Sequence, residues 1–120
     1  MPLESTIESN NRDYCKQLGI IFRKLNFGEG WPDRLLLYRG EVLFIEYKQK
    51  GAKPTKLQLW MHEKLREQGF QVEVVDESIK GRELIKDWHD RVDNKLAEVR
   101  GSHDQNQRSG PNVQRDRGPQ

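Results

Sequence analysis

Asp33, Glu46 and Lys48 are the residues whose types and spacing best suit chemistry. Carboxylate oxygens are hard ligands of the kind that Mg²⁺ or Mn²⁺ prefers. A metal held by them would lower the pKa of a bound water and neutralise charge on a phosphate. The ammonium of Lys48 would position the attacking water and stabilise the developing negative charge. The three residues therefore predict metal-assisted hydrolysis of a phosphate ester.

A predicted β-hairpin brings the two carboxylates together. Leu35–Tyr38 and Val42–Tyr47 are apolar, β-branched or aromatic runs, and the Arg39-Gly40 step between them suits a tight turn in which glycine takes positive φ. Antiparallel pairing about this turn places Asp33 opposite Glu46. Directly opposed residues have Cβ atoms about 4.5 to 5.5 Å apart and point to the same face.

Two carboxylates so placed repel each other. A cation must offset the repulsion, or one carboxyl must stay protonated, or the pair must be splayed into water. Lys48 lies two residues beyond Glu46 and hence on the same face of the strand, so it brings an ammonium to the pair. A surface ion network on an edge hairpin, contributing about 0 to 1 kcal/mol, is the alternative interpretation of these three residues.

Pro32-Asp33 and Glu46-Tyr47-Lys48 resemble the signature of the PD-(D/E)XK nuclease superfamily. The local sequence is more similar still to the small stand-alone members of the virus-type replication-repair nuclease (VRR-NUC) family. The features that carry this likeness are the Gly30-Trp31-Pro32-Asp33 stretch, the LFIEYK strand, the lysine-rich loop after it, and Gln58 at the start of the next helix. The resemblance covers roughly residues 8–76 and implies an Mg²⁺- or Mn²⁺-dependent endodeoxyribonuclease.

The resemblance also implies further metal ligands. The backbone carbonyl of Tyr47 and an acidic residue from the first helix would complete the shell around Asp33 and Glu46. Glu8 is the matching acidic position, although Glu4 is a second candidate. Glu8 has a simpler explanation as well, because a glutamate in a first helical turn is favoured by the helix dipole.

Gln58 has two interpretations. Thr55 and Gln58 have the spacing of a capping box, in which the glutamine amide binds the backbone N–H of Thr55. In the resembled family, a glutamine at this position lies close to the catalytic strand and touches the site. The sequence leaves both open.

The segment from Lys48 to Lys56 holds four lysines and no acidic residue. Such loops are usually only solvated. Beside a carboxylate pair, Lys50, Lys53 and Lys56 are better explained as contacts to a DNA backbone, because lysine ammonium groups displace counterions without reading bases. Trp31 either stacks on a base or sugar or covers the sheet edge.

Hydrophobic periodicity and turn residues predict an α/β domain with a mixed sheet, an order that resembles the core of the nuclease superfamily. The expected elements are a helix at Ser5–Leu18 capped by Ser5 or Thr6, a strand at Ile20–Asn26, the hairpin, a helix from Thr55 to about Gln68 that buries Leu57, Met61 and Leu65, a strand at Gln71–Asp76, and a helix from Ser78 to about Val99. A right-handed crossover would place the last strand parallel to the Glu46 strand. The domain is expected at 1–100 and a disordered polar tail at 101–120.

Composition bounds the remaining possibilities. With 120 residues, 33% apolar and 33% charged, and a net charge of +2, the chain suits one small domain whose basic surface is local. The single cysteine, Cys15, excludes an intrachain disulfide framework. No membrane span or signal peptide is apparent, so we expect a soluble protein in the cytoplasm of a bacterial or phage-infected host. His62, His89 and His103 are isolated and are expected at the surface.

The function expected from the resemblance is cleavage of four-way (Holliday) junctions by a homodimer, in DNA repair or recombination. Leu59, Trp60 and the row of apolar residues around Trp88 are candidates for the dimer interface. A nuclease that nicks duplex DNA or processes its ends is one alternative. A DNA-binding recombination accessory protein without catalysis is the other, although the intact Asp33, Glu46 and Lys48 oppose it.

Overall fold

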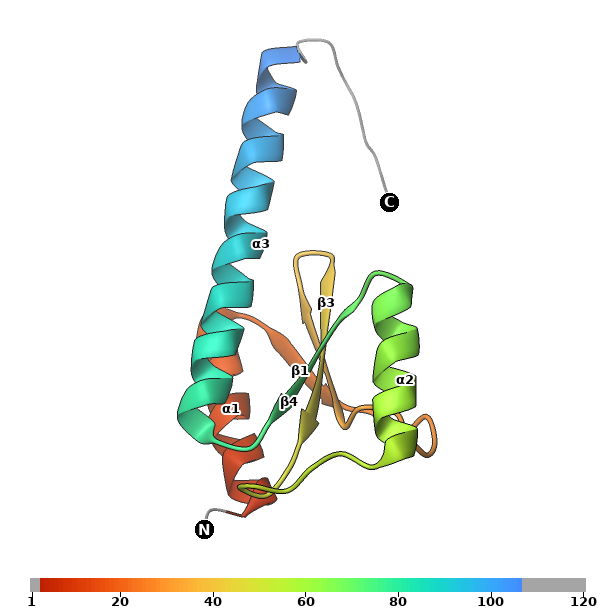
Figure 1. Cartoon of the computed structure of the whole chain (residues 1–120). Helices are drawn as coiled ribbons and strands as arrows, with labels where there is room; N and C mark the ends of the chain where they lie inside the picture. Colours follow the sequence, from red (N-terminus) through yellow and green to blue (C-terminus); the bar gives the residue numbers. More distant parts are fainter. Residues whose placement is uncertain (1–2, 107–120) are drawn as a thin grey trace. The chain divides into compact units, whose positions relative to one another are not determined.

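A computed structural model describes the backbone of residues 3–106 and the side chains of residues 3–99. The elements, in chain order, are α1 (Glu4–Leu18), β1 (Ile21–Lys24), β2 (Arg34–Tyr38), β3 (Glu41–Tyr47), α2 (Lys56–Glu67), β4 (Gln71–Val75) and α3 (Ser78–Asn106). This is the predicted element order (Figure 1). None of the described helices is both long enough and apolar enough to cross a membrane.

The four strands form one mixed sheet in the order β1-β2-β3-β4. β1, β2 and β3 pair antiparallel, and β4 returns through α2 to pair parallel with β3. The β2–β3 turn has positive φ at both Arg39 (49°) and Gly40 (85°), the combination that matches the twist of a two-residue hairpin. The predicted hairpin register is confirmed, since Tyr38 pairs with Glu41 and Arg34 with Ile45.

Helices cover both faces of the sheet, with α2 on one side and α1 on the other (Figure 1). On the α2 face, Phe44 and Val72 pack in a buried cluster with Leu65 of α2. On the α1 face, the fully buried Leu36 and Tyr47 lie beneath the helix. Because strand side chains alternate between faces, Glu46 belongs to the α2 face and its neighbours Ile45 and Tyr47 to the α1 face.

Asn11 joins three elements on the α1 face. Its Oδ1 accepts a hydrogen bond of 2.9 Å from the Tyr47 hydroxyl, and its Nδ2 donates to the backbone oxygen of Ser78 at 3.1 Å. Gly81 in α3 is required for this approach, because a Cβ there would lie 1.9 Å from Oδ1 of Asn11. The hydrogen bond from its hydroxyl to Asn11 thereby fixes Tyr47, whose backbone takes part in the candidate site, on the α1 face.

The chain divides into two units, and the division falls within α3 after residue 89. The domain bounds expected from the sequence, 1–100, stay a prediction. α3 also continues past the predicted end at Val99 to Asn106, where composition had indicated disorder. Extending an existing helix adds one hydrogen bond for each residue fixed, which favours continuation through a polar segment. The rest of the predicted tail, 107–120, lies outside the described residues.

Local details of the helices differ from prediction. α1 begins after Leu3, whose backbone oxygen accepts from Thr6 and Ile7, so neither Ser5 nor Thr6 is the N-cap. In α2 the buried residues are His62 and Leu65, whereas Leu57 is 44% exposed. A Cβ on Gly30 would lie 2.9 Å from Cγ of Leu57, so the loop before β2 passes close to that side chain. The helix is therefore rotated from the predicted orientation.

Candidate active site

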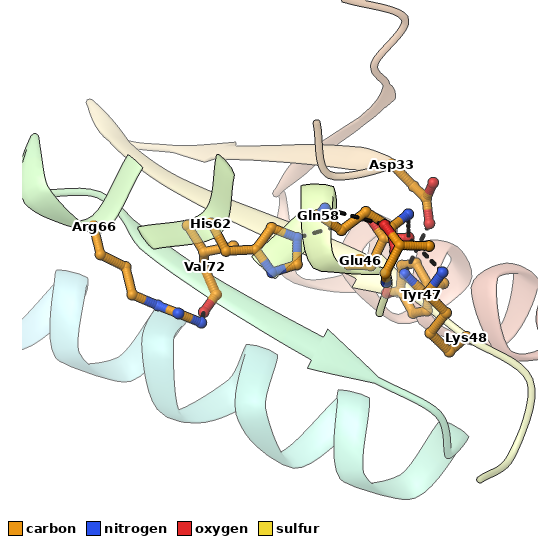
Figure 2. A network of polar contacts seen from close by, with 9 residues as sticks. Asp33, Glu46, Tyr47, Lys48, Gln58, His62, Arg66 and Val72 are labelled. Carbon is orange, nitrogen blue, oxygen red and sulfur yellow. Dashed lines mark hydrogen bonds and ion pairs between the residues drawn. The ribbon is translucent and has the colours of Figure 1, made fainter. Parts of the chain in front are cut away.

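Asp33 and Glu46 lie at the open end of the β2–β3 hairpin, as predicted. The register that pairs Arg34 with Ile45 puts Asp33 opposite Glu46, one step beyond the paired strand. Oδ2 of Asp33 accepts a hydrogen bond of 2.9 Å from the backbone N–H of Tyr47 (Figure 2). This bond fixes the carboxylate of Asp33 against the end of β3.

Glu46 is almost completely buried, with 2% of its surface exposed. Its Oε2 accepts from the side-chain amide of Gln58 at 3.0 Å and lies 3.4 Å from Nζ of Lys48. Its Oε1 has no hydrogen-bond partner among the described residues. Burial first and the charge of Asp33 second raise the pKa of Glu46 from 4.5 to about 7, against the opposing effect of Lys48. The burial rules out a surface ion network.

Gln58 satisfies both interpretations of its position. Its Oε1 accepts from the backbone N–H of Thr55 at 2.8 Å, and the Thr55 hydroxyl accepts from the backbone N–H of Gln58 at 3.1 Å, which completes the capping box. Its Nε2 donates to Glu46 from the other end of the same amide. The helix cap therefore holds the donor that orients the Glu46 carboxylate (Figure 2).

His62 was predicted at the surface, and that prediction is wrong. The imidazole is fully buried one turn beyond Gln58, with Nε2 3.9 Å from Oε1 of Glu46 (Figure 2). Burial first, and the charges of Arg66 and Lys48 next, lower the pKa of His62, which keeps the ring neutral at pH 7. His62 has no metal-binding partner nearby in the sequence, but this did not mean that it is exposed. It is buried because α2 turns this side chain towards the sheet. His89 is half-buried and stacks on Tyr38, so it too departs from the prediction. The side chain of His103 lies outside the described residues.

Glu8 lies on the α1 side of the sheet and forms an ion pair with Arg34, whose Nη2 is 2.9 Å from Oε2 of Glu8. Burial raises the pKa of Glu8, Arg34 opposes that rise, and the charge of Asp33 adds to it. Glu8 is therefore within electrostatic reach of the carboxylate pair. Glu4, the other candidate, is exposed. Among residues 3–99, no three Asp, Glu, His or Cys side chains gather closely enough to hold a metal by themselves.

The predicted DNA-contacting residues lie in different environments. Lys53 and Lys56 are exposed, whereas Lys50 pairs with Glu77. Trp31 makes edge contacts with Phe27 and Phe44, at ring-centroid distances of 5.1 and 6.3 Å, and packs on the buried cluster of the α2 face. This packing is the arrangement expected of a residue that covers the sheet edge.

Comparisons with known proteins agree with this geometry. No protein-family model matches the chain. A protein of Acyrthosiphon pisum secondary endosymbiont phage 1, named "Putative nuclease p44", is 38% identical over 76 residues, which span 61% of this chain and 82% of the phage protein. A solved structure described as a VRR_NUC domain superposes with a TM-score of 0.64 and 33% identity, covering 69% of this chain and 94% of that one. The chain belongs to the VRR-NUC family.

The mixed four-stranded sheet with its three helices matches the VRR-NUC fold, and the chain is a nuclease domain. The predicted family and fold are thus confirmed. In this VRR-NUC domain Asp33, Glu46, Lys48 and Gln58 meet at one end of the sheet. The metal-ligating, catalytic and DNA-binding roles assigned from the sequence stay predictions.

The residues present fit a divalent cation. Oε1 of Glu46 is a buried carboxylate oxygen without a hydrogen-bond partner among the described residues, and the neighbouring charge of Asp33 disfavours ionisation of Glu46. A cation between the two carboxylates would favour the ionised form of both. All these donors are hard oxygens, which suit Mg²⁺ or Mn²⁺ better than softer transition metals.

Sequence reasoning missed two residues of the VRR-NUC site and one that supports it. Arg34 lies just before the predicted strand Leu35–Tyr38 and was given no role, although an arginine directly after Asp33 places a positive charge beside the site. His62 follows Gln58 by four residues, and this spacing places both side chains on one face of α2. Asn11 had a signal as well, since it lies midway between Ile7 and Cys15 on the buried stripe of α1.

Proposed function

We propose that this VRR-NUC domain is a metal-dependent DNA endonuclease that hydrolyses phosphodiester bonds. The observation that carries the proposal is the set of contacts around Glu46: a buried carboxylate beside Asp33, oriented by Gln58, next to Lys48, and with one oxygen unpartnered among the described residues. One lysine balances the charge of only one carboxylate, so a structural ion pair does not explain the second carboxylate. A divalent cation would balance the charge of both.

Each residue has a separate part in this proposal. Asp33 and Glu46 would hold Mg²⁺ or Mn²⁺, with the backbone carbonyl of Tyr47 and the carboxylate of Glu8 as further candidate ligands. The ion supplies Lewis-acid chemistry, a lowered pKa of bound water and neutralisation of phosphate charge.

Lys48 and Gln58 contribute chemistry of the chain itself. Nζ of Lys48 lies 3.4 Å from Oε2 of Glu46, so the ammonium stays beside the pair, where it positions the attacking water and stabilises negative charge on the phosphate. Gln58 holds Glu46 in one orientation through its amide.

The decisive experiment is a cleavage assay on labelled DNA with and without Mg²⁺ or Mn²⁺. We expect cleavage only with the metal, and loss of cleavage in Glu46→Ala while circular dichroism reports an intact fold. Glu73→Ala, on the parallel neighbour strand, is the matched control and should cut normally. Full activity in Glu46→Ala would end the assignment of Glu46 to the catalytic centre.

Lys48 and the loop lysines should separate into two classes. Lys48→Ala should lose turnover far more than DNA affinity. Removal of Lys50, Lys53 and Lys56 together should lose affinity and flatten its dependence on salt, because each phosphate contact releases counterions. Equal loss of turnover and affinity in Lys48→Ala would reduce Lys48 to one more phosphate contact.

We further propose that the preferred substrate is a four-way junction and that the active form is a homodimer. One carboxylate centre cuts one strand at a time, so symmetric cleavage of a junction needs two centres, which a twofold dimer supplies. The outer face of α2 supports such an interface, since Leu59 and Trp60 are 52% and 55% exposed. Trp88, proposed from the sequence for the same purpose, is 4% exposed and unsuited to it.

Sedimentation and junction cleavage test this assembly together. Leu59→Glu/Trp60→Glu should yield a monomer that no longer cuts a junction symmetrically. Ile79→Glu, at an apolar site on α3 that is 69% exposed, should stay dimeric. A wild-type monomer at assay concentration that cleaves linear and four-way DNA equally would leave only a generic endonuclease.

A further inference from the structure

A cavity of about 270 Å³ lies on the α1 face of the sheet. One wall is a stripe of α1 at helical spacing: Ser5, Glu8, Ser9 and Arg12. The other wall comes from β1 and β2 and consists of Phe22, Lys24 and Arg34. Lys24 pairs with Arg34 across the strands and so shares its face. The proposed catalytic and DNA-binding residues do not line this cavity, except for Glu8.

The charge of this cavity favours an anion. Arg12, Lys24 and Arg34 are cationic, and Glu8 is the one carboxylate in the wall. Glu8 is already paired with Arg34, which also donates from Nη1 to the backbone oxygen of Asp33 at 3.1 Å. The lining residues therefore carry two net positive charges, those of Arg12 and Lys24.

Neither Arg12 nor Lys24 forms a strong ion pair with another described residue. The contact of Arg12 with its chain neighbour Asp13 is 3.8 Å long between side chains that are 59% and 69% exposed, and such pairs contribute about 0 to 1 kcal/mol. Lys24 is exposed at the end of β1. The hydroxyls of Ser5 and Ser9 add donors of the kind that bind phosphate oxygens.

The cavity adjoins the carboxylate pair. Arg34 follows Asp33 directly, and Glu8 is close enough to Asp33 for that charge to raise its pKa. The lysine loop leaves the site at the end of β3, whereas the cavity lies against β1, two strands away in the sheet. The carboxylates therefore have a basic surface on each side, and a strand crossing them would reach both.

We propose that the Arg12–Lys24 cavity binds a backbone phosphate of the DNA strand that is being cut, next to the scissile phosphate. This inference rests on the proposed endonuclease function. Contacts of this kind set the position and register of the strand without reading its bases. They would also hold the strand on the side that the lysine loop does not reach.

Arg12→Ala/Lys24→Ala tests the cavity, with Arg23→Ala/Lys64→Ala as a control that removes the same charge from exposed positions. Arg23 pairs with Leu35 and so points to the opposite face of the sheet from Lys24. Binding of labelled DNA is measured by anisotropy over a range of salt concentrations without metal. The cavity variant should lose about 0.9 from the slope of log K against log salt, the amount expected for one phosphate contact. The control should keep the wild-type slope.

Cleavage of DNA carrying one neutral methylphosphonate near the cut site locates the contact. One such position should raise KM in the wild type but cause no further rise in the cavity variant, because the partner charge is already gone. A cavity variant with wild-type slope and KM, or a control that loses as much, would overturn the proposal. Wild-type protein that cuts no DNA with Mg²⁺ or Mn²⁺ would instead overturn the endonuclease function, and the salt slopes would still report on the cavity.

Discussion

The side-chain amide of Gln58 donates to Oε2 of Glu46 over 3.0 Å while its own oxygen caps the helix that carries it. A structural device, the capping box, and a site contact are thereby combined in one side chain. Substitutions of Thr55 and of Gln58 distinguish the cap from the site contact, because Thr55 takes part only in the cap.

Thr55→Ala should therefore lose only the stability of the cap, whereas Gln58→Ala should lose more stability and also activity. Loss of an N-cap oxygen costs about 1 kcal/mol of unfolding free energy, and both variants weaken the cap. Only Gln58→Ala also removes a hydrogen bond to a charged group, worth about 1.5 to 3 kcal/mol, or about 10- to 160-fold in rate if it is lost from the transition state. Urea unfolding and single-turnover cleavage measure the two effects. Equal activity in both variants would show that Gln58 is only a cap.

The raised pKa of Glu46 predicts how stability depends on pH without metal. The pKa is about 7 in the fold against 4.5 ordinarily, so the protonated carboxyl is favoured by folding. Its stabilising contribution is complete below about pH 4.5 and is lost as pH rises to about 7. The melting temperature should thus fall more between pH 5 and 7.5 in the wild type than in Glu46→Gln, and Mg²⁺ should raise it at the upper end. Parallel pH profiles in the two proteins would contradict this.

Two substitutions of Asp33 should move stability in opposite directions. Asparagine keeps an oxygen for the backbone N–H of Tyr47 and removes the charge that raises the pKa of Glu46. Asp33→Asn should therefore match or exceed the wild-type melting temperature at pH 8. Alanine leaves that N–H without its acceptor, at about 1 to 3 kcal/mol if no water replaces it. Both should abolish cleavage, and an Asp33→Asn protein less stable than Asp33→Ala would refute the argument.

Gly81→Ala should destabilise the domain, although alanine is favoured over glycine inside a helix by about 1 kcal/mol. The new Cβ would lie 1.9 Å from Oδ1 and 2.8 Å from Cγ of Asn11, which is fully buried and cannot move aside. The clash should outweigh helix propensity and cost about 1 to 3 kcal/mol. Calorimetry measures it. Adding Asn11→Ala should make the Gly81→Ala change less costly, and strict additivity of the two would argue against the contact.

His62→Leu should leave stability unchanged or raise it. The imidazole is fully buried and neither nitrogen has a hydrogen-bond partner among the described residues, so an apolar side chain of similar size removes two unsatisfied polar atoms. Cleavage should survive, because the ring lies 3.9 Å from the carboxylate oxygen and forms no hydrogen bond to it. Guanidinium unfolding that shows a loss above about 2 kcal/mol would mean that a water or proton links His62 to Glu46.

The sequence by itself was sufficient for features that depend on near neighbours or on a fixed period. The Arg39-Gly40 turn sets the register of its hairpin, and the alternation of strand side chains then puts Asp33 opposite Glu46 on one face. The capping box at Thr55 follows in the same way from local spacing. Each of these follows from backbone geometry within one element or one hairpin.

Only the tertiary structure decided which helix faces meet the sheet. The rotation of α2 exposes Leu57 and buries His62 beside Glu46, and the packing of α1 pairs Glu8 with Arg34 and Asn11 with Tyr47. A helical stripe in the sequence permits several rotations that bury similar apolar area. The choice between them depends on long-range fits, such as the close approach of Gly81 to Asn11, which no local pattern encodes.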